Sequence, residues 1–174
     1  MLREGHAFDV VMHALSLRLD ARSLLAWSRW ITPQRPTVTN QRFDTLFFVA
    51  RMPANQTARH DDHEAVDSVW LRPRDALRSY WDGDIDFAPP QIISLAHLSR
   101  FPSVELVQQD IRRQRPVLVE PEPFERNGER VAAYPGDPQH SRPLRALLGP
   151  TRLTYRNRRF EPPGGFDGFF QHAA

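Results

Sequence analysis

Five consecutive residues, His60-Asp61-Asp62-His63-Glu64, bring two imidazoles and three carboxylates together in the sequence. Side chains of these types can coordinate a divalent metal ion, or hold a general base beside one. The spacing matches no standard zinc pattern, and H-D-D-H-E differs from the H-E-x-x-H pattern of metalloproteases. Motif-free polar clusters usually mark loops, so a solvated loop that leads into a strand at Glu64 is the favoured alternative.

A second pattern interleaves arginines with aromatic residues over residues 155–160, Y-R-N-R-R-F. Proteins that bind single-stranded nucleic acid combine these residue types. A half-exposed β-hairpin with Asn157 near its turn explains the alternation equally well. All 23 basic residues are arginine, yet the formal net charge is only +2. So small a charge gives no reason to expect a nucleic-acid partner.

Several chemistries are excluded by what the sequence does not contain. The chain has no cysteine, which rules out disulfides, thiolate zinc sites and a cysteine nucleophile. It has no G-x-S-x-G elbow, glycine-rich phosphate loop or dinucleotide fingerprint. An aromatic ligand cage is conceivable, but core packing is the favoured role of the tryptophans. These are Trp27, Trp30, Trp70 and Trp81. Taken alone, the residues form no complete catalytic constellation.

The elements that would position these residues begin with a helix. Apolar residues recur at helical spacing over residues 6–19, which predicts an amphipathic helix. Residues 24–31 are expected to be extended, because prolines follow at 33 and 36. Residues 42–51 are apolar on both faces, which predicts a strand inside a sheet that helices cover on each side. After a polar loop, residues 64–71 are expected to form another strand.

The rest of the chain is expected to form helices first and short strands later. Proline at the first helical position predicts helices from Pro73 and Pro89, and Ser103 is the expected N-cap of a third that ends before Pro116. Short strands are predicted at 117–121, 129–134 and 152–160, with a tight turn at 135–137. Residues 161–174 are expected to be a tail, either disordered or docking its phenylalanines on a partner.

Four segments occur in an order that resembles a known family. They are W-S-R-W-I-T-P (27–33), R-F-D-T-L-F-F-V-A-R-M-P (42–53), E-A-V-D-S-V-W-L-R-P-R-D-A-L (64–77) and A-A-Y-P-G-D-P-Q-H (132–140). Together with a Pro-Pro helix start at residues 89–90, they resemble the C-terminal half of a Nudix hydrolase of the peroxisomal coenzyme A diphosphatase type. The resemblance extends from about Arg3 to about Phe160.

The resemblance implies an α+β fold, with a partial Nudix-like mixed sheet flanked by helices and a C-terminal extension of short strands. The corresponding parts are residues 1–115, the extension 116–160, and the tail 161–174. The family hydrolyses coenzyme A or other nucleoside-diphosphate-linked compounds, and its R-E-x-x-E-E-x-G glutamates bind magnesium or manganese. No such glutamate pattern occurs in the 174 residues. We therefore expect the chain alone to bind no metal and to be inactive.

By the same resemblance, a loop outside the glutamate motif can supply further carboxylates. Glu64 is the candidate base, and Asp61 and Asp62 are the candidate metal ligands. Arg42, Trp30 and Phe47 are the candidate contacts to a nucleotide moiety. The alternative function is a non-enzymatic interaction module or a split-enzyme subunit.

The expected partners follow from these two functions. They are a second copy of the chain, a complementary N-terminal half, or a nucleotide substrate once the domain is complete. The N-terminus lacks a signal-peptide pattern, and no apolar run approaches the roughly 18 residues of a membrane span. We therefore expect a cytoplasmic protein without a membrane partner.

Overall fold

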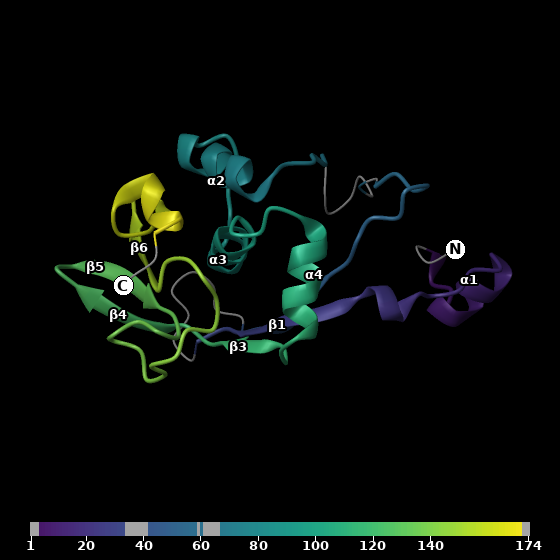
Figure 1. Cartoon of the computed structure of the whole chain (residues 1–174), viewed down its shortest axis with the longest axis horizontal. Coiled ribbons are helices and arrows are strands. Elements are labelled where there is room, and N and C mark those ends of the chain that lie inside the picture. The colour runs from purple at the N-terminus through teal and green to yellow at the C-terminus, as the bar shows by residue number, and fades with distance from the viewer. Residues whose placement is uncertain (1–3, 34–41, 59, 61–66, 172–174) are drawn as a thin grey trace.

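The computed structural model describes residues 4–33, 42–58, 60 and 67–171. Within these ranges the chain forms four α-helices, seven β-strands in two sheets and two short 3₁₀ helices, which confirms the predicted α+β class. In Figure 1 the three later helices stand above the strands, and the N-terminal helix lies apart at the end of an extended segment. None of the helices in these ranges is both long and apolar enough to cross a membrane.

The first sheet is mixed and has three strands in the order β2-β1-β3. The central strand β1 (Leu25–Ile31) pairs antiparallel with β2 (Asp44–Val49) and parallel with β3 (Val117–Val119). Alternate residues of β1 face the core, so Trp30 is 4% exposed and Ser28 is fully buried. The extended segment predicted at 24–31 is thus confirmed.

The prediction that the strand within 42–51 is buried on both faces is wrong. In the described part of the chain β2 has one neighbour, β1, and is therefore an edge strand. Phe47 and Val49 are half-buried against the core, whereas the opposite face carries exposed Leu46 and Phe48. Apolar residues on both faces predicted burial, but no described element covers the second face.

Three helices pack on the sheets where the prolines and Ser103 predicted them. They are α2 (Pro73–Asp82), α3 (Pro89–Leu98) and α4 (Val104–Arg112). Pro73 lies at the start of α2, and Gly83 ends it with a φ of 90°, a left-handed conformation that glycine adopts without strain. The Ser103 hydroxyl accepts a hydrogen bond from the Leu106 amide (3.4 Å), as expected of an N-cap.

The second sheet is antiparallel, with strands in the order β4-β5-β6-β7. These are β4 (Glu122–Arg126), β5 (Glu129–Ala133), β6 (Arg152–Arg156) and β7 (Arg159–Glu161). Asn157 and Arg158 turn the β6–β7 hairpin with φ of 47° and 62°, which confirms the hairpin expected from the Y-R-N-R-R-F alternation. β4 was not predicted, because Pro121 and Pro123 interrupt its pattern.

The C-terminal segment packs on the same chain. A short 3₁₀ helix (Gly165–Phe169) buries Phe169 completely, edge-on to Trp81. Arg78 stacks over the ring of Phe166, 3.4 Å from its centroid. The Arg100 guanidinium donates to the Phe170 carbonyl oxygen at 2.5 Å. The phenylalanines of the tail, up to residue 171, therefore dock on α2 and its neighbours, not on a separate partner.

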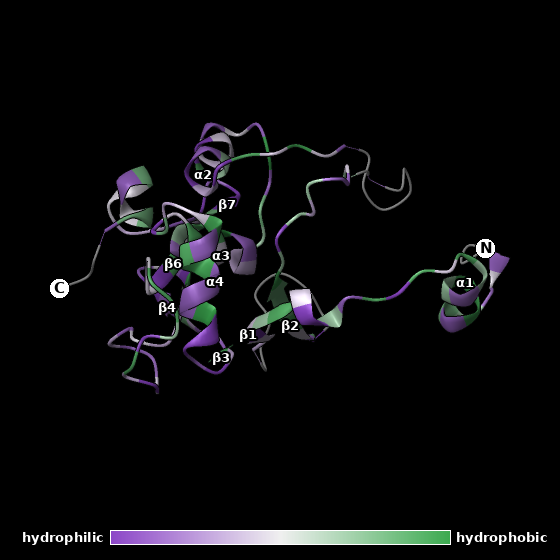
Figure 2. Ribbon diagram, turned by 45° about the vertical axis from the view of Figure 1, so that its right-hand side comes forward, coloured by the Kyte–Doolittle hydropathy of each residue, from purple (hydrophilic) through white to green (hydrophobic). Residues whose placement is uncertain are grey.

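Two predicted elements differ from the structure near the N-terminus and before α2. The helix α1 covers only Phe8–Ala14, so the expected extent of 6–19 is wrong. In Figure 2 this helix stands away from the sheets, and Phe8 is 54% exposed, so no packing favours further turns. The strand expected at 64–71 lies partly outside the described residues. Its described part, 67–71, is not a strand, and Trp70 is 75% exposed.

Candidate functional site

A groove of about 600 Å³ lies where the two sheets meet the start of α3. Its walls are mainly aromatic rings and prolines. The lining includes Trp30, Phe43, Phe47, Tyr80, Phe87, Pro89, Pro90, Pro121, Pro123, Tyr134, Tyr155, Arg158, Arg159 and Phe160. Grooves that combine apolar walls with a few polar groups are the usual form of small-molecule sites. This groove is therefore the candidate functional site.

One wall is built by the paired strands β1 and β2. Trp30 and Phe47 alternate inward from these strands, and their ring centroids lie 6.2 Å apart. The indole nitrogen of Trp30 donates a hydrogen bond to the Ser28 hydroxyl (3.2 Å), which fixes the orientation of the ring. Trp30, which is 4% exposed, supports this wall from the core, and the half-buried Phe47 presents the ring face on which a flat group can stack.

Two tyrosines form the floor of the groove. The Tyr80 hydroxyl donates to the Phe160 carbonyl oxygen (3.0 Å) and accepts from the Phe160 amide (2.9 Å), and so joins α2 to β7. The Tyr134 hydroxyl is buried and has no hydrogen-bond partner in the described part of the chain. Burial raises the pKa of Tyr134 well above its ordinary value, so the hydroxyl keeps its proton. It is thus a buried donor for which the described residues supply no acceptor.

Charged side chains lie at one end of the groove. Arg159 stacks on Trp81, 4.5 Å from the ring centroid, and its guanidinium donates to Glu161 (2.9 Å). Arg158 is exposed at the tip of the β6–β7 hairpin and has no ion pair with any residue that the structure describes. A free guanidinium beside an aromatic wall can bind an anionic group attached to a flat or apolar moiety.

The groove contains no recognisable hydrolytic machinery. In the ranges that the structure describes, no three histidine, aspartate or glutamate side chains gather into a group that could hold a metal ion. Asp86 is the one carboxylate among the groove residues. The arrangement is therefore suited to binding, and no catalytic step can be assigned to the described side chains.

The structure brings together some of the predicted site residues and not others. Trp30 and Phe47 both line the groove. Arg42 does not: it is exposed, and its guanidinium donates to the Thr32 carbonyl oxygen (3.2 Å), which ties the ends of β1 and β2 together. The expected carboxylates Asp61, Asp62 and Glu64 lie outside the described residues.

Other groove residues were not predicted. Tyr80 lies in α2 and Tyr155 in β6, whereas Phe87 precedes α3 and Tyr134 follows β5, and no local spacing connects the four residues. The core role expected of the tryptophans holds for the buried Trp27 and Trp30, but not for the exposed Trp70.

Comparison with known proteins places this chain in a family. The model of the NUDT19 Nudix domain matches residues 2–98. The chain is 35% identical over 80 residues to acyl-coenzyme A diphosphatase NUDT19 of Xenopus laevis, which covers 45% of this chain and 21% of the relative. It is 33% identical over 85 residues to the Homo sapiens protein of that name. This alignment covers 49% of this chain and 22% of the human relative.

The aligned region thus spans only about a fifth of the length of these curated relatives. No solved structure matches the chain. The family match covers more than half of the 174 residues, and includes β1, β2, α2, α3 and most of the residues that line the groove. The chain therefore belongs to the NUDT19 Nudix domain family.

Proposed function

We propose that this chain supplies the substrate-binding wall of a Nudix-type diphosphatase that acts on coenzyme A or another nucleoside-diphosphate-linked compound. The observation that carries the proposal is the aromatic groove, whose Trp30–Phe47 wall comes from the family-matched region. A nucleobase would stack on the half-buried ring of Phe47 in this wall. Arg158 would bind a phosphate group at the charged end.

The catalytic half of the proposal concerns the metal. Nudix chemistry uses magnesium or manganese, which neutralises phosphoryl oxygens and activates water. The described side chains do not fit such an ion, because no metal-binding group of acidic or histidine side chains forms among them. Asp61 and Asp62 stay proposed as ligands and Glu64 as base, but only beside a segment that carries the R-E-x-x-E-E glutamates. We propose that the 174 residues alone do not hydrolyse diphosphates.

Binding at the groove is tested by titrating coenzyme A into the full chain, by calorimetry. We expect Phe47→Ala to weaken binding by roughly tenfold, since stacking of a base on an aromatic ring contributes about 1–3 kcal/mol. The matched control is Phe48→Ala, which removes the same ring from the opposite, exposed face of β2. Equal affinities for the two variants would place the ligand elsewhere.

Catalysis is tested separately by incubating the chain with coenzyme A and either magnesium or manganese. Chromatography should detect no 3′,5′-ADP above a protein-free blank. Clear turnover would overturn the proposed inactivity but leave the binding result intact. The cytoplasmic location stays a prediction that cell fractionation can check.

The second candidate function is protein interaction through β2. Its face carries Leu46 and Phe48, which are 45% and 50% exposed, and its outer edge pairs with no strand in the described ranges. An exposed apolar edge strand is a template for pairing with another chain. We propose that a second copy pairs there, or that a chain carrying the Nudix glutamates adds its strand in a split enzyme.

Light scattering after size exclusion distinguishes the two occupants. A dimer that dissociates in Leu46→Lys would support self-pairing. Leu144→Lys is the control, because Leu144 is 82% exposed and lies outside both sheets. A monomer at all concentrations would exclude self-pairing and leave the split-enzyme arrangement as the remaining form of this candidate.

A further inference from the structure

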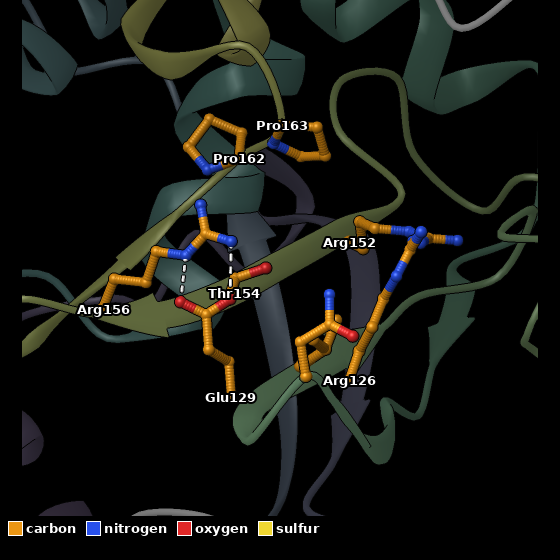
Figure 3. A pocket seen from close by; sticks show the side chains of 9 residues that line it. Arg126, Glu129, Arg152, Thr154, Arg156, Pro162 and Pro163 are labelled. Carbon is orange, nitrogen blue, oxygen red and sulfur yellow. Dashed lines mark hydrogen bonds and ion pairs between the residues drawn. The ribbon is translucent and has the colours of Figure 1, made fainter.

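A second cavity, of about 540 Å³, lies on the four-stranded sheet and is lined by arginines instead of aromatic rings. Figure 3 shows it from close by. Its lining residues are Arg126, Asn127, Glu129, Val131, Arg152, Thr154, Arg156, Pro162 and Pro163. None of them lines the groove described above.

The strand register puts the two cavities on opposite faces of this sheet. Side chains alternate along β6, so Thr154 and Arg156 face one way while Leu153 and Tyr155 face the other. Tyr155 lines the aromatic groove, whereas Thr154 and Arg156 line the arginine pocket. A ligand in the pocket would therefore not touch the groove.

Two of the arginines are held in place by carboxylates. Arg152 makes two hydrogen bonds to Asp137, at 2.6 and 2.7 Å, and the Asp137 side chain is completely buried. Arg156 makes two hydrogen bonds of 2.5 Å to Glu129 on the neighbouring strand (Figure 3). In both pairs Nε and Nη2 are engaged, which leaves Nη1 of each guanidinium to donate to something else.

The third arginine has no such partner. The Arg126 side chain makes no ion pair or hydrogen bond with the residues that the structure describes. In Figure 3 its side chain lies on the same side of the pocket as Arg152, while Thr154 lies between these and Arg156. Since Glu129 and Asp137 neutralise two of the three guanidinium groups, the pocket keeps one uncompensated positive charge beside the Thr154 hydroxyl.

We propose that this arginine pocket binds a phosphate dianion, either free inorganic phosphate or a phosphomonoester on a small carrier. Phosphate oxygens accept hydrogen bonds from several guanidinium groups at once, and fixed arginines lose little entropy on binding. The rings of Pro162 and Pro163 close one side of the pocket (Figure 3). The site is independent of the aromatic groove and does not rest on the proposed diphosphatase function.

The test is calorimetric titration of the full chain with inorganic phosphate, and in a second arm with ribose 5-phosphate, at low ionic strength. Both should bind saturably. We expect Arg126→Gln to weaken binding by roughly tenfold, because the phosphate loses one charged hydrogen-bond donor. Thr154→Val should weaken it less. Arg112→Gln removes the same charge from α4, away from the pocket, and should leave binding unchanged.

The two arms identify the source of the phosphate. Equal affinities would assign the pocket to the dianion itself, and tighter binding of ribose 5-phosphate would assign it to a carried phosphomonoester. If Arg126→Gln and Arg112→Gln weaken phosphate binding equally, the proposal is overturned, because the total charge of the chain would then explain the binding. A phosphodiester dinucleotide that binds as tightly as phosphate would also overturn it. Phe47→Ala should leave phosphate binding unchanged.

Discussion

Replacing Asp137 by alanine should be among the most destabilising single changes in the four-stranded sheet region. The Asp137 carboxylate is completely buried, accepts from Arg152 twice, and also accepts from the Gln139 amide (2.8 Å) and the Thr151 hydroxyl (3.3 Å). The variant leaves the guanidinium of Arg152, only 19% exposed, without its counter-ion. Removing one partner of a buried ion pair costs about 3–5 kcal/mol.

That loss is large on the scale of a whole domain, whose free energy of unfolding is about 5–15 kcal/mol. The assay is urea denaturation followed by tryptophan fluorescence, with the midpoint compared at constant slope. Asp137→Asn should lower the free energy of unfolding by less, because the amide oxygen of asparagine can still accept a hydrogen bond from the Gln139 amide. Binding of phosphate in the arginine pocket should also fall, since Arg152 would no longer be fixed.

The matched control is Glu129→Ala on the same sheet. Glu129 also makes two hydrogen bonds to one arginine, Arg156, but both side chains are in contact with water, at 34% and 51% exposed. Exposed ion pairs contribute little, because water and salt replace the partner. Glu129→Ala should therefore lower the free energy of unfolding by only a small fraction of the loss expected for Asp137→Ala. Similar losses for the two variants, or an Asp137→Ala chain within about 1 kcal/mol of the wild type, would refute the argument from burial.

Two further predictions concern His97 and Phe169. Burial lowers the pKa of His97 below its ordinary 6.5, so the unfolded chain takes up the proton first as the pH falls. The free energy of unfolding should therefore decrease below about pH 6.5. His97→Asn, which keeps an acceptor for the Leu148 amide, should flatten that dependence in denaturation curves at pH 5–8; an unchanged slope would contradict this cause. Phe169→Ala should cost about 3–5 kcal/mol in the same assay, because its ring is completely buried, whereas Leu144→Ala should change little; equal midpoints would show that the tail does not contribute to the core.

The sequence predicted the elements whose signals are local. Pro73, Pro89 and Ser103 begin their helices where expected, because a proline or a capping hydroxyl acts within one turn. Asn157 lies in the turn of its hairpin for the same reason. In each case the deciding interaction lies within four residues of the signal.

The predictions that failed concern apolar segments, which were expected to be buried by a neighbouring element. Phe48 is apolar and exposed on β2, because burial depends on a packing partner that no local pattern can reveal. The strand predicted up to Leu71 is absent from its described part, because no neighbouring strand pairs with the chain there. The groove was predicted in part: Trp30 and Phe47 lie on paired strands, whereas Tyr80 and Tyr134 join them only through the tertiary fold.

Because side chains alternate along β6, this short strand supplies residues to both cavities, and a change in its register would disturb both. Leu153 and Tyr155 face the groove side, and Thr154 and Arg156 face the arginines, so point substitutions can alter one side while sparing the other. An insertion or deletion of one residue would rotate every following side chain to the wrong face. Length changes within β6 should therefore be far less tolerated, in evolution or in engineering, than changes of residue type.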